Sequence, residues 1–282
     1  AEFNVYRREV GDSSPPTQIE TGLTTQSYSD TTVEKWKSYL YSVGAVEGGI
    51  EKISTETLVR AYNFKSSITD LFTGSQKGFA YDFSDLSTMF QDTAGTTPVT
   101  AVDQLVARVN DLSGNNNHLI QSTSGSRPIL KQDAKGYYLQ FDGTNNFMQT
   151  SGTVDLSGLS LFTAFASLSK ERNVAEVIFE TSTNYNDNSG AMLLYFDTNK
   201  ITVVTRGEGT HPSGYAYVDV ATTTGGVFTT QANLAAVSNK ITTFRKDGVS
   251  QTMIGMLDNT SSTLTNQTLY VGTRAGSGVY LQ

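Results

Sequence analysis

The chain has 282 residues and a formal net charge of −7, with 14 Tyr, 14 Phe, 25 Gly and no Cys. The absence of Cys excludes disulfides, thiolate zinc sites and cysteine nucleophiles, so packing alone must stabilise the folded state. There is no run of Lys or Arg and no apolar stretch of about 18 residues, so we expect neither a nucleic-acid partner nor membrane insertion. Aromatic residues with Thr, Val, Ser and Gly are typical of short strands joined by tight turns, which predicts an all-β protein.

In residues 1–61, side-chain types alternate as in short antiparallel strands, which predicts a first domain there. The length of the chain leaves room for a second domain after residue 61. The alternation begins near the N-terminus, stops at the turn-forming cluster 11–16 and then resumes. In the run 38–46, a period of two places Tyr39, Tyr41, Val43 and Ala45 on one face. A glycine pair, Gly48 and Gly49, can supply the turn into a returning strand over residues 51–60.

This first module resembles a partial fibronectin type III domain, an immunoglobulin-like sandwich. Residues 3–7 look like its third strand, residues 22–30 like the following turn and strand, and residues 39–46 like its sixth strand. The resemblance implies that two N-terminal strands are missing, because the chain is cut upstream or because the domain is unusual. It also implies that Tyr39 occupies the tyrosine-corner position, where the hydroxyl binds upstream backbone.

A linker is expected over residues 62–80, followed by a second module over residues 81–282. A short helical turn over residues 84–90, with Ser84 as its N-cap, is expected near the start of that module. Strand signals then recur without a long helix, which fits a double-sheet jelly roll. The expected strands are 104–109, 137–141, 160–168, 174–180, 191–197, 200–206, 215–221, 233–237, 240–246 and 268–272.

Three local patterns support a more specific interpretation of the second module. They are the Asn- and Gly-rich turn 111–118, the strand and turn 137–147, and the hairpin 240–249 with Asp247 and Gly248 at its tip. In this order they resemble the concanavalin A-like lectin/glucanase superfamily, in the laminin-G-like form common in bacteriophage tail proteins. Residues 81–115 are similar to phage and prophage structural proteins. The family continues into a closing strand after residue 274, so the resemblance implies that this strand is missing here.

Glu176 and Glu180 are the nearest match to a catalytic carboxylate pair. Glucanases of this superfamily carry two carboxylates two or four residues apart on one strand, so that nucleophile and acid face the same groove. A regular strand would place Glu176 and Glu180 on one face, but Ile178 stands where the pattern needs another acid. Solvated or hydrogen-bonded glutamates are the alternative, and we expect a protein that is not an enzyme.

Two loops contain the groups that sugar recognition requires, an exposed aromatic ring beside amides and carboxylates. The candidates are Tyr185, Asn186 and Asp187 in one loop, and Arg206, His211, Tyr215 and Tyr217 in the other. Solvated loops without a ligand are the alternative. Asp111, Asp142 and Asn145 offer hard oxygen ligands and are the calcium candidates, although Asx turns explain them equally well. No other cofactor is expected.

The leading hypothesis is a non-enzymatic bacteriophage virion protein of the tail fibre or tail tip, assembled in the host cytoplasm. The jelly roll is expected to contact host-surface glycan or other virion subunits, with the first module as a spacer and the whole chain as a homo-oligomer. One alternative is a glucanase-like polysaccharide depolymerase. The other is a purely architectural decoration or spacer protein, for which scattered rather than clustered exposed aromatic residues would be the sign.

Overall fold

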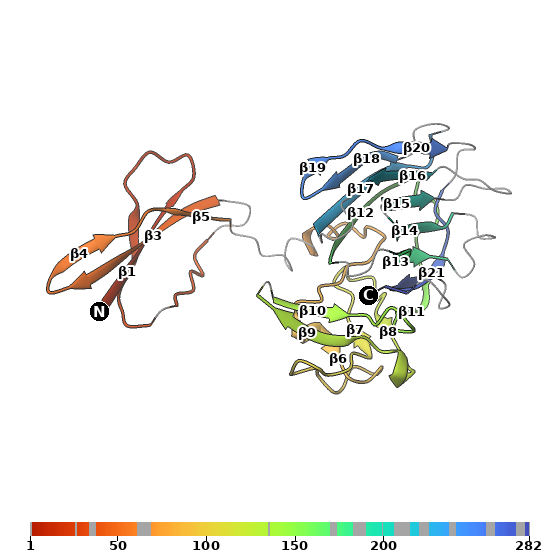
Figure 1. Cartoon of the computed structure of the whole chain (residues 1–282), viewed down its shortest axis with the longest axis horizontal. Coiled ribbons are helices and arrows are strands. Elements are labelled where there is room, and N and C mark those ends of the chain that lie inside the picture. The colour runs from red at the N-terminus through yellow and green to blue at the C-terminus, as the bar shows by residue number, and fades with distance from the viewer. Residues whose placement is uncertain are drawn as a thin grey trace. The chain divides into compact units, whose positions relative to one another are not determined.

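In the computed structural model, the regular structure of the described residues is almost entirely antiparallel β-sheet, which confirms the predicted all-β class (Figure 1). The chain divides into two compact units: unit 1 covers Ala1–Asp70, and unit 2 covers Leu71–Gln282. Their boundary falls inside the stretch 62–80 that the sequence predicts as a linker. The described residues are 2–25, 27–33, 38–60, 69–134, 136–169, 174–182, 190–198, 200–205, 215–219, 226–236, 241–257, 263–274 and 280–281.

The described strands of unit 1 form a single sheet in the order β2-β1-β3-β4, and β5 also pairs with β3. Gly48 and Gly49, with φ angles of 59° and 79°, make the predicted turn between β3 and β4. The returning strand expected over 51–60 is divided into β4 and β5, and residues 27–30 form no strand, so that part of the prediction is wrong. The strands are β1 (Glu2–Glu9), β2 (Thr17–Leu23), β3 (Ser38–Glu47), β4 (Ile50–Ile53) and β5 (Thr57–Arg60).

Asp30 connects the chain after β2 to one face of this sheet. Its Oδ2 atom accepts hydrogen bonds from Arg7 at 2.7 Å and from the Tyr41 hydroxyl at 2.8 Å. Burial opposes ionisation of this carboxyl group, but hydrogen bonds from Thr32, Tyr41 and Arg7 outweigh it and lower the pKa of Asp30 to about 2. The tyrosine-corner role of Tyr39 stays a prediction. The Arg7 guanidinium lies over the Tyr39 ring, and the nearby Tyr41 hydroxyl donates to Asp30.

Unit 2 contains a ten-stranded, a four-stranded and a two-stranded sheet. The ten-stranded sheet contains, in order, β20 (Ile254–Leu257), β16 (Tyr215–Asp219), β15 (Lys200–Thr205), β14 (Met192–Asp197), β13 (Glu176–Thr181), β21 (Gln267–Val271), β11 (Met148–Val154), β8 (Leu119–Ile120), β7 (Arg108–Val109) and β6 (Met89–Phe90). The four-stranded sheet contains β12 (Leu161–Leu168), β17 (Gly226–Asn233), β18 (Ile241–Lys246) and β19 (Val249–Ser250). The third sheet pairs β9 (Ile129–Asp133) with β10 (Gly136–Gln140).

The two larger sheets pack face to face around one hydrophobic core, so unit 2 is a β-sandwich. Phe196 of β14 meets Phe228 of β17 across the sheets in a T-shaped contact, with ring centroids 5.9 Å apart. Phe244 of β18 packs beside Phe228 at 6.3 Å. This arrangement agrees with the double-sheet prediction, while the concanavalin A-like assignment stays a prediction.

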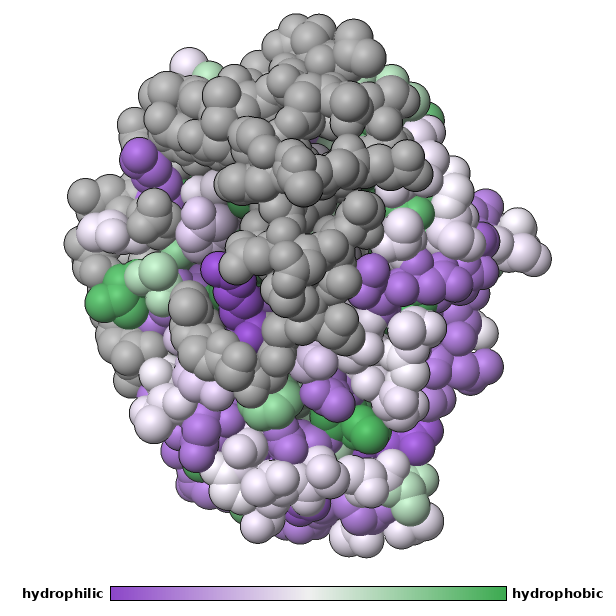
Figure 2. Space-filling view, turned by 90° about the vertical axis from the view of Figure 1, so that its right-hand side faces the viewer, coloured by the Kyte–Doolittle hydropathy of each residue, from purple (hydrophilic) through white to green (hydrophobic). Residues whose placement is uncertain are grey.

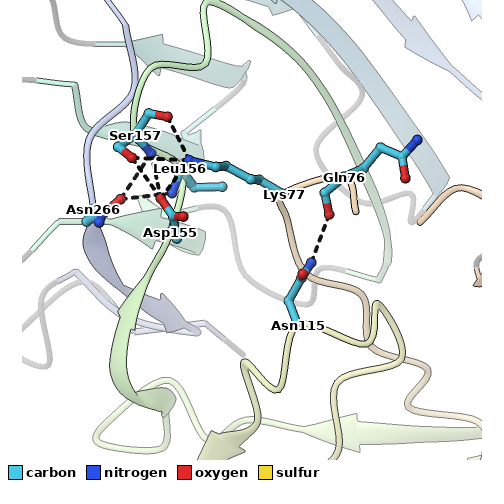
Figure 3. Close-up of polar contacts among 7 residues, drawn as sticks. All are labelled: Gln76, Lys77, Asn115, Asp155, Leu156, Ser157 and Asn266. Carbon is cyan, nitrogen blue, oxygen red and sulfur yellow. Dashed lines mark hydrogen bonds and ion pairs between the residues drawn. The ribbon is translucent and has the colours of Figure 1, made fainter. Parts of the chain in front are cut away.

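Residues 71–80 are part of unit 2, although the sequence predicts a linker there. Phe79 packs against the core. Lys77 Nζ donates hydrogen bonds to Asp155 Oδ1 at 2.9 Å and to the Ser157 carbonyl at 3.0 Å (Figure 3). Asn266 Oδ1 accepts the Ser157 N–H at 3.0 Å, and these contacts together fix the turn that leads into β12.

Two local predictions have clear outcomes. The Asp247-Gly248 turn is confirmed between β18 and β19, with φ angles of 51° and 80°. The helical turn expected over 84–90 is the short 3₁₀ helix η1 (Leu86–Thr88), and Asp85 rather than Ser84 caps it, by accepting the Ser87 N–H at 3.0 Å. A second 3₁₀ helix, η2, covers Ser124–Ser126. Within the described ranges, no helix has the length and apolar character needed to cross a bilayer.

Candidate functional site

Two of the most exposed apolar side chains among the described residues of the sandwich lie on β12. Alternate residues of this strand face the core, and the others face outward on the side of the four-stranded sheet away from the ten-stranded sheet. Leu161 is 66% exposed and Phe165 is 64% exposed, which is far more than the average for such side chains in a folded protein. On the neighbouring strand β17, Val227 faces the same way and is 45% exposed.

Polar side chains share this outward face with the apolar ones. Phe165 lies opposite Thr229 of β17, which in turn lies opposite Arg245 of β18. In the adjacent row, Gln231 separates Thr163 from Thr243, and the Thr243 hydroxyl donates a hydrogen bond to Gln231 Oε1 at 3.0 Å. We call this surface the outer patch and define it as Leu161, Thr163, Phe165, Val227, Thr229, Gln231, Thr243 and Arg245.

The exposed aromatic residues do not gather at one place among the described residues of unit 2. Phe165 lies on β12, whereas Tyr138, which is 40% exposed, lies on β10 of a different sheet. On the side shown in Figure 2, the described surface is mainly hydrophilic or neutral, and its hydrophobic residues form small separate areas. The scattering is the sign expected of an architectural protein rather than of an aromatic sugar platform.

Most residues predicted to bind sugar lie outside the described residues: Tyr185, Asn186, Asp187, Arg206 and His211. The backbones of Tyr215 and Tyr217 are described, in β16 opposite Val204 and Thr202 of β15. The prediction of a sugar site at these loops stays a prediction.

The expectation that Glu176 and Glu180 share a strand face is wrong. A β-bulge interrupts β13 between Val177 and Phe179, so that Ile178 is an extra residue in the strand. Ile178 and Phe179 both pack into the core, which shows that the alternation of side chains is reset there. The bulge therefore turns every residue after it to the face opposite the one that a regular strand would give.

The two carboxylates consequently point to opposite sides of the sheet. Glu176 lies opposite Phe196, which faces the core, whereas Glu180 lies opposite Leu193, which belongs to a separate apolar cluster on the other face. Both glutamates are 0% exposed. Glu180 lies opposite Tyr270 of the neighbouring strand β21. Burial of Tyr270 and the negative charge of Glu180 both raise the pKa of Tyr270. The two carboxylates cannot act on one bound glycosidic bond, because that requires convergence on a common groove.

Asp111 is held by hydrogen bonds from its own turn and from Ala80, and its predicted role as a calcium ligand stays a prediction. Its Oδ1 atom accepts N–H groups from Ala80 at 2.9 Å and Ser113 at 3.0 Å. Its Oδ2 atom accepts the Ser113 hydroxyl at 2.6 Å and the Asn117 N–H at 3.0 Å. Donors already point at both oxygens, so the carboxylate organises the turn. Burial and the charge of Arg108 lower the pKa of the adjacent His118, whose Nδ1 accepts the Asp111 N–H.

Asp142 has the same local role, and Asn145 is one of the residues that it holds. Asp142 Oδ1 accepts N–H groups from Thr144 at 2.9 Å, and from Asn145 and Asn146 at 3.0 Å. Burial opposes the ionised form of Asp142, but these backbone hydrogen bonds outweigh it and lower the pKa. Within the described part of the chain, no three His, Asp or Glu side chains are grouped to hold a metal ion. The Asx-turn interpretation accounts for the hydrogen bonds of both turns, and calcium binding stays a prediction.

Unit 1 has a shallow cavity of about 660 Å³. Tyr6, Arg8 and Pro16 contribute to its lining. The Arg8 guanidinium is already held by Glu56 through two hydrogen bonds of 2.7 Å. Because its charged group is neutralised inside the unit, this cavity is a weaker candidate than the outer patch.

Sequence reasoning missed the outer patch, although the signal is present. The run over Leu161–Leu168 has apolar residues on both faces. A strand that is buried on one side needs apolar residues on one face only. A scan against protein-family models and a search of curated protein sequences both find no match to this chain. The class that the fold defines is therefore an all-β chain of two units, the second of which is a β-sandwich with an exposed sheet face.

Proposed function

We propose that this chain is a non-catalytic structural protein of a bacteriophage virion, and that it contacts another protein subunit through the outer patch. The observation that carries the proposal is the exposure of Leu161, Phe165 and Val227 on one sheet face. Larger exposed apolar patches that are rimmed by polar residues mark interaction sites on proteins. The phage context rests on the resemblance of residues 81–115 to phage structural proteins.

The chemistry of the patch favours a protein over a carbohydrate. Leu161 and Val227 can offer only apolar area, and sugar hydroxyls gain nothing from aliphatic groups that lack a polar partner. A protein interface, in contrast, typically combines an apolar centre with polar residues around it. Thr163, Gln231 and Arg245 supply such a polar surrounding.

The arrangement of β13 supports a role without catalysis of the glucanase kind. Glu176 and Glu180 are buried on opposite faces of their sheet, so the carboxylate pair of the depolymerase alternative is not assembled. If the purified chain released reducing sugar from bacterial capsule polysaccharide, and Glu180→Gln abolished the release, the proposal would be wrong.

The proposal is tested by incorporation into virus particles. Particles are purified from cells that express the full chain or the variant Leu161→Ser/Phe165→Ser, and the chain is quantified in them by mass spectrometry. We expect the wild-type chain in the particles and at least a tenfold lower amount of the variant. Tyr138→Ser is the control, because Tyr138 is also an exposed aromatic but lies outside the patch. Equal incorporation of all three chains would refute the patch as the contact, and their absence from particles would refute the virion role.

Glycan binding by the same face is a second candidate, favoured by one specific arrangement. The row Phe165, Thr229 and Arg245 places a guanidinium and a hydroxyl beside an exposed ring. An array of bacterial surface glycans, probed with the full chain and with Phe165→Ser, tests it. Binding that disappears in Phe165→Ser, and persists in Tyr138→Ser, would favour the glycan over the protein partner.

A further inference from the structure

The outer edge of β12 is an open sheet edge. β12 is the end strand of the four-stranded sheet, and among the described strands only β17 pairs with it (Figure 1). All eight of its residues lie in one uninterrupted ladder with β17. A long regular strand at an edge offers a row of backbone donors and acceptors to any further strand.

The hydrogen bond between Leu234 and Ser160 shows which backbone groups point outward. Leu161 lies opposite Asn233, so Ser160 lies opposite Leu234, and the Leu234 N–H donates to the Ser160 carbonyl at 2.6 Å. In an antiparallel ladder, residues bonded to a given neighbour alternate with residues whose N–H and C=O point to the other side. The even-numbered residues of β12 therefore bond to β17. The odd-numbered residues, from Leu161 to Ser167, direct their backbone groups to the open edge.

The core is also incompletely covered along this strand. Phe162, Ala164, Ala166 and Leu168 face the core but are only partly buried. On the next strand, Phe228 is 1% exposed although it belongs to the same core. Apolar area is thus left open on the inward side of β12, beside the unpaired backbone.

The devices that natural edge strands use against pairing are missing from β12. Its sequence, LFTAFASL, contains no Lys, Arg, Asp, Glu or Pro. Charged side chains and proline are the usual means by which an exposed edge is kept from pairing with another chain. In a chain whose net charge is −7, this neutral strand is a place where two copies can approach without like charges facing each other.

We propose that β12 pairs with β12 of a second copy of this chain, antiparallel and about a two-fold axis at Ala164. This inference goes beyond the proposed function, because it concerns the backbone edge of β12 and not the outer patch. In this register Leu161 lies opposite Ser167, and Thr163 lies opposite Phe165. All four residues have outward-pointing backbone groups, so the two strands exchange about eight hydrogen bonds.

Side-chain volumes favour this register. Each large outward side chain meets a small one, Leu161 against Ser167 and Phe165 against Thr163. On the inward side, Phe162 meets Ala166, and Ala164 meets its own copy, where the closest approach of the strands needs a small residue. A partner of different sequence would not have this match built into a single strand. The pairing joins the two four-stranded sheets into one continuous sheet and leaves both outer patches exposed.

Disulfide trapping tests the pairing and its register, because the chain contains no Cys of its own. In Ala164→Cys, the two introduced thiols face each other across the axis, at a Cα separation of about 4.5 to 5.5 Å that suits a disulfide. In Ala166→Cys, the two thiols are four residues out of register, about 13 Å apart. Both substitutions add one sulfur at a partly buried alanine of the same strand, so they are a matched pair.

We expect the full-length Ala164→Cys chain to form a covalent dimer under mild oxidation at micromolar concentration, and Ala166→Cys to stay monomeric under the same conditions. Dimers of both variants, or of neither, would overturn the proposal. Loss of incorporation in the particle experiment does not affect this result, because trapping is measured on the purified chain. The two proposals can therefore fail separately.

Charge substitution gives an independent measurement of the same register. Leu161→Lys/Ser167→Lys places two ammonium groups opposite each other at both ends of the paired strands, and Leu161→Lys/Ser167→Glu places opposite charges there. Positions 161 and 167 of one chain are about 20 Å apart, beyond the screening length of about 8 Å at physiological salt. The two introduced charges of a single chain therefore barely affect each other, and the difference between the variants reports the contact between chains. We expect the Lys/Lys chain to associate roughly tenfold more weakly than the Lys/Glu chain in sedimentation velocity. Equal association would refute the register.

Discussion

Removal of the Phe228 ring should show that the two sheets of unit 2 stabilise each other through one core. Phe228 is 1% exposed and contacts both Phe196 of the opposite sheet and Phe244 of its own. Truncation of a buried Phe to Ala typically costs about 3–5 kcal/mol, because apolar transfer is lost and a cavity remains. For a unit of this size, about 4 kcal/mol corresponds to a fall of roughly 10 °C in Tm. Calorimetry of full-length Phe228→Ala measures the change.

Phe165→Ala is the matched control for this experiment. Phe165 belongs to the same sheet, on the strand next to Phe228, but its ring is 64% exposed and faces away from the core. Its removal should change the free energy of unfolding of unit 2 by no more than about 0.5 kcal/mol. A cost below about 1 kcal/mol for Phe228→Ala, or equal costs for the two variants, would refute the interpretation that burial between two sheets holds this unit together.

Two further predictions concern a pH-dependent contact and a turn that is closely packed at a glycine. The pKa of Asp30 is lowered from 3.8 to about 2, so the ionised carboxylate stabilises unit 1 above pH 3.8, and this contribution is lost as the pH falls through 2. Acid titration followed by circular dichroism should show this loss of stability. The pH-dependent loss should be absent in Asp30→Asn. A wild-type profile retained in Asp30→Asn would contradict the assignment. A Cβ atom at Gly190, where φ is +67°, would lie 2.7 Å from the Thr263 carbonyl oxygen and from the Thr265 nitrogen. Gly190→Ala should therefore destabilise unit 2 by more than about 1 kcal/mol in urea unfolding, whereas an unchanged midpoint would show that the turn can shift freely.

Much of the strand pattern could be predicted from the sequence, because it depends on local alternation and turn residues. The strand expected over 160–168 is β12, the one over 240–246 is β18, and the turn between β18 and β19 forms at Asp247 and Gly248. The strand expected over 233–237 is wrong, because β17 ends at Asn233. β11 was missed as well, because its sequence MQTSGTV has few apolar residues and its pairing with β21 joins distant segments of the chain.

The sequence by itself determined the all-β class, the glycine turns and the absence of any cysteine chemistry, since composition and nearest-neighbour backbone preferences are enough for these. Only the tertiary structure decided which way the glutamates of β13 point, because the bulge at Ile178 depends on how β13 pairs with β14. It also decided which strand has an open edge. The exposure of Leu161 and Phe165 follows from the end position of β12 in its sheet, and strand order is set by contacts between segments that are distant in sequence.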